Sequence, residues 1–205
     1  METLPFGGLL TYGLVGVAAL SFLEKFIPVM PSYVLLALFG LLVVGEPGDL
    51  FGVITASTAG SVGGAATWYV LGRMIGGRRS EWLFERYGKF LFLPRGLYGR
   101  LAAAYARNPF WVTFVGQTVP TVRIYLAVPA GVIGLAFVPF LLATALGALA
   151  WNGPLVTLGY LLRDTGWTPA HAGIAFASAI VAVEVAAFLL VARLRRNRLR
   201  SATVQ

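Results

Sequence analysis

Long uncharged stretches dominate the pattern of apolar and polar positions along the chain. Residues 50–72, 140–162 and 172–183 contain no Asp, Glu, Lys, Arg or His. An apolar helix of about 20 residues is long enough to cross the hydrocarbon core of a bilayer. The pattern therefore predicts membrane-spanning helices over 50–72, 140–162 and 172–192.

Two further apolar segments, residues 24–44 and 109–138, are interrupted by proline. The interruptions are Pro28 and Pro31 in the first segment, and Pro120 and Pro129 in the second. Proline removes a backbone donor and breaks a helix. Non-helical backbone at membrane depth is tolerated only where it is buried in protein or lines a watery cavity. We therefore expect two re-entrant helical hairpins, the first opening outward and the second inward.

Each of these segments is followed by a span rich in Gly, Ala and Thr, and the two units repeat after roughly 90 residues. Weak internal symmetry of this kind is typical of secondary transporters. The predicted fold is an all-α integral membrane protein. It is an inverted repeat of two re-entrant hairpins, each followed by a transmembrane helix, with one more transmembrane helix at the C-terminal end. Residues 1–192 form a single membrane domain and residues 193–205 a basic tail.

Composition and charge support a membrane protein and orient it. Hydrophobic residues make up 58% of the chain and charged residues 12%, whereas soluble domains carry roughly 25% charged residues. The net charge of +8 is concentrated in the loop 73–107 and the tail 193–205. Basic segments beside membrane spans lie in the cytoplasm, so the charge is assigned to cytoplasmic loops near anionic lipid and not to nucleic-acid binding. The loop also carries aromatic residues at helical spacing, which indicates either interfacial amphipathic helices or an ordinary connector.

The chain offers few groups for covalent or metal chemistry. It has no cysteine and one histidine, His171. This composition excludes disulfides, thiolate nucleophiles and Cys-ligated metals. A nucleophile with an activating base, or a catalytic metal, is the usual requirement of an intramembrane enzyme. We therefore expect neither an enzyme nor a bound cofactor.

Three ionisable residues lie within apolar sequence: Glu24, Arg123 and Glu184. A charge at the centre of a bilayer costs at least about 2.5–3.5 kcal/mol, so such residues are usually functional or paired. Glu24 opens the first hairpin and Arg123 lies at the break of the second. They either line one cavity as a carboxylate–guanidinium pair or only pin the hairpins together. Lys25 is expected to extend toward the interface. Glu184 faces either the bundle interior or a partner subunit, which leaves a homodimer open.

Four motifs occur in order along the chain. They are E-x₃-P-x₂-P-S (Glu24, Pro28, Pro31, Ser32), Y-x-L-G-R-x-x-G (Tyr69 to Gly76), P-x-x-R-x₅-P-A-G (Pro120, Arg123, Pro129, Ala130, Gly131) and F-x₆-G-x₃-W-N (Phe140, Gly147, Trp151, Asn152). In this order and spacing, the motifs resemble the DedA family of bacterial membrane proteins, also called VTT-domain or SNARE-associated proteins, over residues 8–165.

The resemblance implies transport of lipid across the bacterial cytoplasmic membrane. Members of the family move undecaprenyl phosphate or phospholipids such as phosphatidylethanolamine, and proton coupling has been proposed for them. Glu24 matches the acid of the family's first hairpin, and Arg123 matches the second of its two arginines. The chain departs from the family at Tyr33, where many members have an acid, and at Gln117, where they have the first arginine.

The sequence therefore predicts a multi-pass transporter whose partners are a lipid substrate and the bilayer. The alternative is a scaffolding protein of envelope maintenance or division. The expected substrate-binding and transport residues are Glu24, Arg123, Gln117, Pro28, Pro31, Ser32, Tyr33, Pro120 and Asn152. We also expect Asn152, with Trp151, to hydrogen-bond a hairpin loop as structural support.

The predicted topology is tested by cysteine labelling, for which the absence of native cysteine gives a clean background. Cysteines introduced at Ser80 and Ser201 should both resist an impermeant thiol reagent in intact cells and react after the membrane is permeabilised. Labelling of either residue in intact cells contradicts a cytoplasmic loop and tail.

Overall fold

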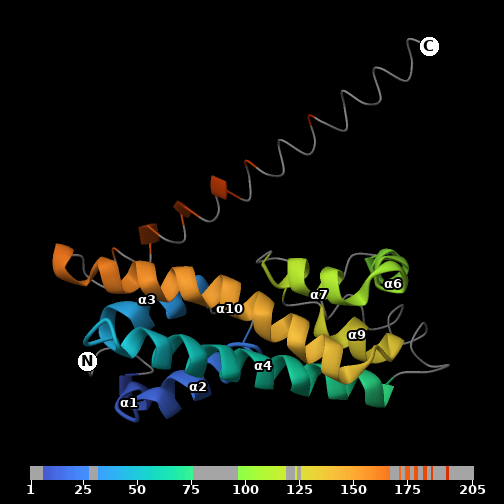
Figure 1. Ribbon diagram of the computed structural model, residues 1–205, viewed down its shortest axis with the longest axis horizontal. Coiled ribbons are helices and arrows are strands. Elements are labelled where there is room, and N and C mark those ends of the chain that lie inside the picture. Colours follow the sequence, from blue (N-terminus) through green and yellow to red (C-terminus); the bar gives the residue numbers. More distant parts are fainter. Residues whose placement is uncertain are drawn as a thin grey trace.

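The computed structural model describes residues 7–27, 32–75, 97–118, 123 and 126–166, with the isolated positions 171, 174, 175, 178, 179, 182, 183, 186 and 193. Every regular element in these residues is helical (Figure 1), as predicted. The elements are α1 (Gly7–Leu10), α2 (Leu14–Leu23), α3 (Ser32–Leu42), α4 (Asp49–Ile75), α6 (Leu97–Arg107), α7 (Pro109–Gln117), α9 (Ala127–Ile133), α10 (Phe137–Leu161) and the 3-10 turn η1 (Arg163–Thr165).

Several sequence predictions fall outside the described residues. These are Pro28, Pro31 and Pro120, the greater part of the basic loop, Glu184, most of the predicted span 172–192, and the tail after position 193.

Two long helices, α4 and α10, lie side by side along most of their length (Figure 1). They cover the predicted spans 50–72 and 140–162, and α10 begins slightly earlier than predicted, at Phe137. Continued through η1 to Thr165, α10 is the one helix in the described residues that is both long and apolar enough to cross a membrane. Helix α4 has 27 residues but is richer in Gly, Ser and Thr.

Helices α2, α3 and α4 belong to the first half of the chain, and α7, α9 and α10 to the second. Each long helix is flanked by two short helices, one from each half. Helices α2 and α9 pack against α4, while α3 and α7 pack against α10. The first short helix of each half therefore contacts the long helix that follows it, and the second short helix contacts the long helix of the other half. The first predicted hairpin segment, 24–44, begins directly after α2, which ends at Leu23, and contains α3.

Glycine allows the second short helix of each half to approach its long partner closely. A Cβ atom on Gly40 of α3 would overlap the backbone of α10, and one on Gly159 of α10 would overlap the backbone of α3. Gly131 of α9 and Gly72 of α4 form the equivalent pair at the other contact. In a membrane the hydrophobic effect does not drive helices together, and small residues allow the close packing that does.

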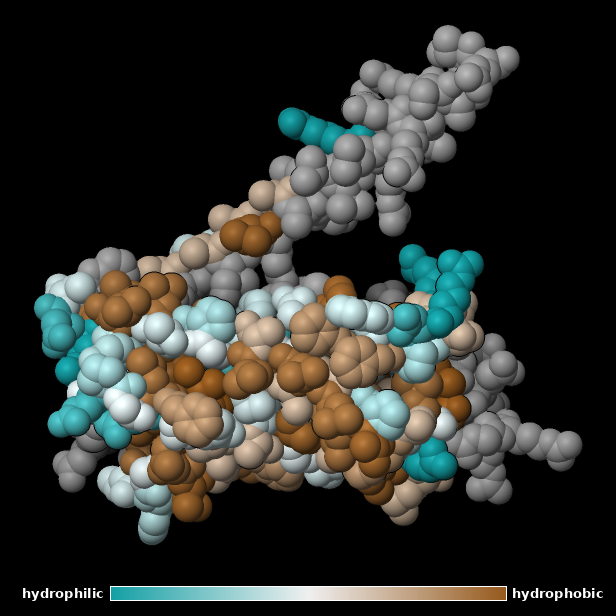
Figure 2. Space-filling model, in the orientation of Figure 1, coloured by the Kyte–Doolittle hydropathy of each residue, from teal (hydrophilic) through white to brown (hydrophobic). Residues whose placement is uncertain are grey.

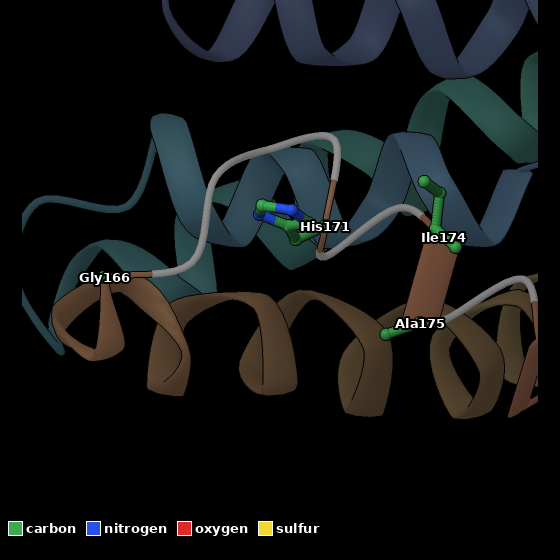
Figure 3. Close-up of a pocket in the computed structure, with 4 residues that line it drawn as sticks. All are labelled: Gly166, His171, Ile174 and Ala175. Atoms are coloured by element: carbon green, nitrogen blue, oxygen red, sulfur yellow. The ribbon is translucent and has the colours of Figure 1, made fainter.

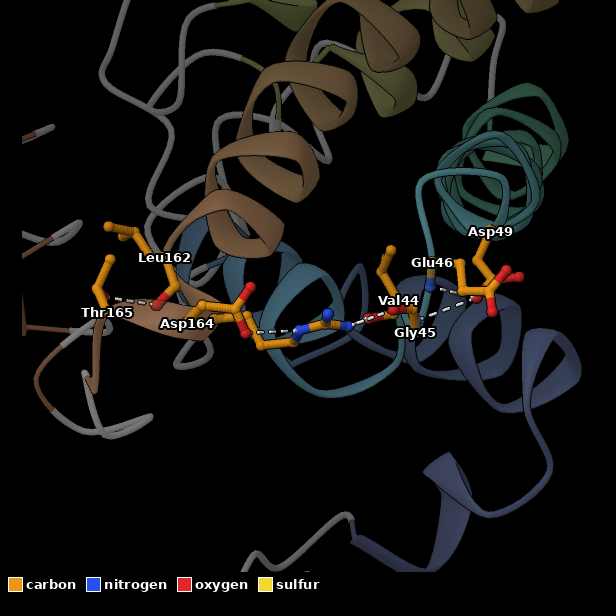
Figure 4. Close-up of polar contacts among 8 residues, drawn as sticks. Val44, Gly45, Glu46, Asp49, Leu162, Asp164 and Thr165 are labelled. Atoms are coloured by element: carbon orange, nitrogen blue, oxygen red, sulfur yellow. Dashed lines mark hydrogen bonds and ion pairs between the residues drawn. The ribbon is translucent and has the colours of Figure 1, made fainter.

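A polar clamp joins the turn after α3 to the end of α10 (Figure 4). Arg163 donates through NH1 to the carbonyl oxygen of Val44, at 2.8 Å, and to that of Gly45. Asp49 holds the same turn from the other side, because its Oδ2 accepts from the backbone N–H of Gly45 at 3.1 Å and of Glu46 at 3.0 Å. These bonds satisfy backbone groups of the turn between α3 and α4, which have no partners in either helix.

The exterior of the helical body is strongly apolar. Figure 2 shows hydrophobic residues spread across the face that carries α4 and α10, with hydrophilic residues gathered mainly toward its ends. Large exposed apolar side chains project from several helices: Val15, Phe51, Met74, Trp111, Val138, Leu142, Leu146, Leu158 and Leu161. Soluble monomers rarely expose contiguous apolar surface of this extent, so the surface is suited to lipid.

The close contact between α9 and α4 predicts a position-specific effect of added volume. Gly131→Ala should lower the free energy of unfolding by about 1–3 kcal/mol, because the new methyl group meets the backbone of α4 and overpacked sites lose about that much. Gly153→Ala is the matched control, since its Cβ would meet nothing within 4 Å. Thermal unfolding in detergent measures both, and equal unfolding temperatures would contradict the tight α4–α9 contact.

Candidate functional site

The turn after α2 places two neighbouring charges against α4. Glu24, Lys25 and Phe26 continue from the last residues of the helix as a hydrogen-bonded turn. The indole Nε1 of Trp68 donates to the carbonyl oxygen of Lys25 at 2.9 Å, and the ring of Phe26 stacks on Trp68 at a centroid distance of 5.4 Å. Trp68 of α4 therefore fixes the turn from which both charged side chains project.

Glu24 is the centre of a buried charge cluster. Its Oε1 lies 3.1 Å from the Nζ of Lys25 and 3.8 Å from NH2 of Arg123. The guanidinium of Arg123 also lies over the ring of Trp151 in α10, at 5.6 Å from the centroid. The side chains of Glu24 and Arg123 are only 4% and 2% exposed. The structure thus brings together the two ionisable residues that the sequence placed at the breaks of opposite halves.

The expectation that Lys25 extends toward the interface is wrong. Its side chain is 13% exposed and turns to Glu24 instead. At 3.1 Å, the ammonium group gives the buried carboxylate of Glu24 a direct ionic partner, which offsets the cost of burying that carboxylate.

The hydrogen-bonding capacity of this cluster is largely unused. Within the described part of the chain, Nε, NH1 and NH2 of Arg123 have no hydrogen-bond partner, and neither has Oε2 of Glu24 or Nε1 of Trp151. A buried donor without a partner costs about 1–3 kcal/mol, and more when it is charged. Such groups are maintained where a ligand or water completes them, so the cluster has the properties of a binding site for an anion.

The cluster lies beside a polar layer in the middle of the two long helices. Asn152 of α10 is fully buried and donates to the hydroxyl of Ser57 in α4 at 3.3 Å. Ser61 and Thr144 are also buried. Apolar cores lie to either side. One consists of Val17, Leu20, Leu35, Leu36, Phe39, Val44, Val53 and Val156. The other contains Ala65, Tyr69, Tyr105, Leu126, Ala127, Ala130 and Phe140.

The remaining predicted site residues occupy different surroundings. Gln117 ends α7 and is 3% exposed, and its Cβ and Cγ pack where a side chain on Gly147 would lie. Ser32 begins α3. Tyr33 packs beside the apolar pair Ala37 and Leu41. Among the described residues, Asn152 bonds to Ser57 of α4, which links the two long helices; the predicted bond to a hairpin loop involves breaks that lie largely outside the described residues.

Sequence reasoning did not identify the residues that position the cluster. A Cβ atom on Gly64 would lie within 3 Å of Cβ and Cγ of Lys25, so this glycine makes room for the lysine stem. Trp68 follows Gly64 by one helical turn and binds the lysine backbone. The pair Gly63-Gly64 inside a predicted helix, with Trp68 one turn later, was the available signal.

A separate pocket lies beyond the end of α10. It is lined by Gly166, His171, Ile174 and Ala175 (Figure 3), and its surface is mainly apolar. No charged side chain is among these described lining residues. The pocket is not the site that the buried ion cluster forms.

Comparison with known proteins identifies the class of protein. The VTT domain profile matches residues 27–161, which include both long helices and Arg123, while Glu24 and Lys25 lie just before the matched range. The chain therefore belongs to the VTT domain, or DedA, family, and it is a membrane protein.

Curated relatives are similar over most of their length. An "Alkaline phosphatase-like protein" of Lactococcus lactis subsp. cremoris is 33% identical over 180 residues, which cover 87% of this chain and 84% of the relative. The "Undecaprenyl phosphate transporter A" of Staphylococcus aureus is 27% identical over 154 residues, covering 75% of this chain and 76% of that protein. The protein of the same name from Bacillus subtilis is 30% identical over 139 residues, covering 66% and 67%. No solved structure matches the chain significantly.

A mutant cycle separates a structural role of Asn152 from a role in binding. Asn152→Ala and Ser57→Ala should each destabilise the protein in detergent, with a coupling energy of about 0.6 kcal/mol, the average for hydrogen bonds between membrane helices. Lipid transport should remain close to the parent rate in both variants. Loss of transport at unchanged unfolding temperature would instead place Asn152 in the substrate site.

Proposed function

We propose that the protein is a lipid transporter that moves a phosphate-bearing lipid across the cytoplasmic membrane. The observation that carries this proposal is the guanidinium of Arg123, which is buried in a membrane protein with none of its nitrogens hydrogen-bonded within the described residues. Arginine presents its donors in a planar fork that matches two phosphate oxygens. The buried guanidinium of Arg123 can donate hydrogen bonds to the phosphate of a lipid headgroup, and these replace the hydrogen bonds that the phosphate loses on leaving water.

The names of the relatives support the same substrate class. Two of them are named undecaprenyl phosphate transporters, and the phosphate of such a lipid is an anion on an apolar chain. A phospholipid such as phosphatidylethanolamine also carries an anionic phosphate. The headgroup would occupy the charge cluster while the apolar chains remain against the exposed hydrophobic surface of the helices.

The helix contacts support an inverted repeat of two re-entrant hairpins. Helices α2 and α3 form the first hairpin, and α7 and α9 the second. The same number of positions separates Gly60 from Gly147 and Gly72 from Gly159, and in each pair the first residue lies in α4 and the second in α10. Gly60 and Gly147 both face the first short helix of their own half. In this architecture the charge cluster lies near the middle of the bilayer, where transporters bind substrate, and the basic loop and tail are cytoplasmic.

Glu24 is the group through which protons are coupled to transport. Within the described residues its carboxylate faces only the cations Lys25 and Arg123. Protonation of Glu24 removes the negative charge beside the headgroup and strengthens phosphate binding, and deprotonation returns that charge and favours release of the lipid. The cycle uses no covalent step, so the protein acts as a transporter and not as an enzyme.

Transport by purified protein in liposomes tests the proposal, with labelled undecaprenyl phosphate and labelled phosphatidylethanolamine as separate probes. Arg123→Lys should slow transport about ten- to a hundredfold, because it removes a charge-assisted bidentate contact worth about 1.5–3 kcal/mol and 1.4 kcal/mol is a factor of ten. Glu24→Gln should give transport that no longer depends on pH.

Arg107→Lys is the matched control, because it makes the same chemical change at an exposed position of α6. Unfolding temperatures of all variants should stay near that of the parent. Parent-like transport by folded Arg123→Lys and Glu24→Gln proteins at every pH would show that the pair is only structural. If the parent protein moves neither lipid, the transporter proposal itself fails.

A further inference from the structure

The two cations of the cluster compete for one carboxylate oxygen. Lys25 and Arg123 both approach Oε1 of Glu24, at 3.1 Å and 3.8 Å. The shorter distance is within the range of a hydrogen bond and the longer one is not. Lys25 is therefore the direct partner of Glu24, and Arg123 is held nearby by charge and by the ring of Trp151.

Helix α4 fixes the position of Lys25 at two points. Trp68 binds its backbone carbonyl oxygen at 2.9 Å. Gly64 leaves the space that the first carbons of the lysine side chain occupy. The ammonium group is thereby directed at Glu24 by elements other than Glu24 itself, which indicates a built contact and not a chance encounter of neighbouring side chains.

The position of Lys25 decides whether the guanidinium of Arg123 is available. A carboxylate and a guanidinium left alone in a buried site form a bidentate pair, in which both oxygens accept from the fork. That pair would occupy the donors that the phosphate requires. With Lys25 in place, Glu24 is held at one oxygen by the ammonium group, and the nitrogens of Arg123 remain without hydrogen-bond partners among the described residues.

The geometry points to Lys25 as a positioning residue for the phosphate site: it retains Glu24 and so keeps the fork of Arg123 open to the anionic headgroup. This inference rests on the proposed function and assigns a role within the same site. When all three groups are ionised, two positive charges face one negative charge, and a bound phosphate supplies the missing anion.

A rescue experiment tests this role with the liposome assay and the same two labelled lipids, alongside binding of each lipid in detergent. Lys25→Met keeps an unbranched side chain and removes the charge. It should lower binding and transport at least tenfold, because Glu24 then closes on Arg123. Lys25→Arg should retain most of the activity. Adding Glu24→Gln to Lys25→Met removes the competing carboxylate, so the double variant should return to within about threefold of Glu24→Gln alone.

A second experiment displaces Lys25 without altering any charge and uses a neighbouring glycine as its control. Gly64→Ala places a methyl group against the lysine stem, whereas Gly63→Ala meets only the ring of Phe22, at 3.3 Å and beyond. Gly64→Ala should lower lipid binding several-fold, Glu24→Gln should restore it, and Gly63→Ala should stay close to the parent. These comparisons remain informative if Lys25→Met does not fold.

The outcomes separate the inference from the transporter proposal. Binding and transport by Lys25→Met at the parent level would overturn the role of Lys25 and leave the transporter intact. A double variant as weak as Lys25→Met would also overturn it, because Lys25 would then contact the lipid directly or act only on folding. A parent protein that binds lipid but does not move it refutes transport, and the binding ratios alone then decide the role of Lys25.

Discussion

The burial of Arg123 is the constraint on which the arrangement of this protein depends. A guanidinium that is 2% exposed among apolar helices must have an anion near it, because removing one partner of a buried pair costs about 3–5 kcal/mol. Glu24 supplies that anion from the other half of the chain. The two halves must therefore meet closely enough for the break after α7 to reach the turn after α2, and α10 contributes the ring of Trp151 at the same point. The charges thus specify which helices are neighbours, while most of the contact area is apolar.

Close approach of the helices is achieved with glycine because lipid gives apolar side chains little reason to prefer protein over membrane. Gly40 and Gly159, and Gly72 and Gly131, lie where any side chain would strike the backbone of the neighbouring helix. These contacts lie on either side of the polar middle layer, in which Asn152 binds Ser57. The glycines hold α3 against α10 and α9 against α4, and the Asn152–Ser57 bond joins the two long helices. Together these contacts fix the distance between the two breaks. The cluster can then keep unpaired donors without the helices closing over them.

The sequence predicted the positions of the helices along the chain better than the contacts between their side chains. Uncharged runs and prolines located the long helices and the interruptions, because both signals act locally on the backbone. Pairing of Glu24 with Arg123 followed from the cost of isolated charge in lipid, which limits the choice to very few residues. The direction of Lys25 could not be predicted in this way, because it depends on the space at Gly64 and on Trp68, both in a helix that begins 24 positions later. The partner of Asn152 was missed for the same reason, since a buried amide can be satisfied equally by a loop or by a facing helix.

The charge balance of the cluster differs from that expected on comparing the chain with its family. The resemblance implies an acid at the position of Tyr33 and a base at that of Gln117, so the two departures together leave the net charge unchanged. Lys25 adds a cation beside Glu24, so the described cluster holds two bases and one acid. An ammonium group is a compact point charge and a guanidinium is a planar fork, so the two bases are not equivalent. The fork is suited to two oxygens of one phosphate, and the point charge is suited to holding a single carboxylate oxygen. A site with one ammonium group and one guanidinium group can bind a phosphate at Arg123 while Lys25 holds the carboxylate of Glu24. Two guanidinium groups would compete for the same oxygens and would separate these roles less well.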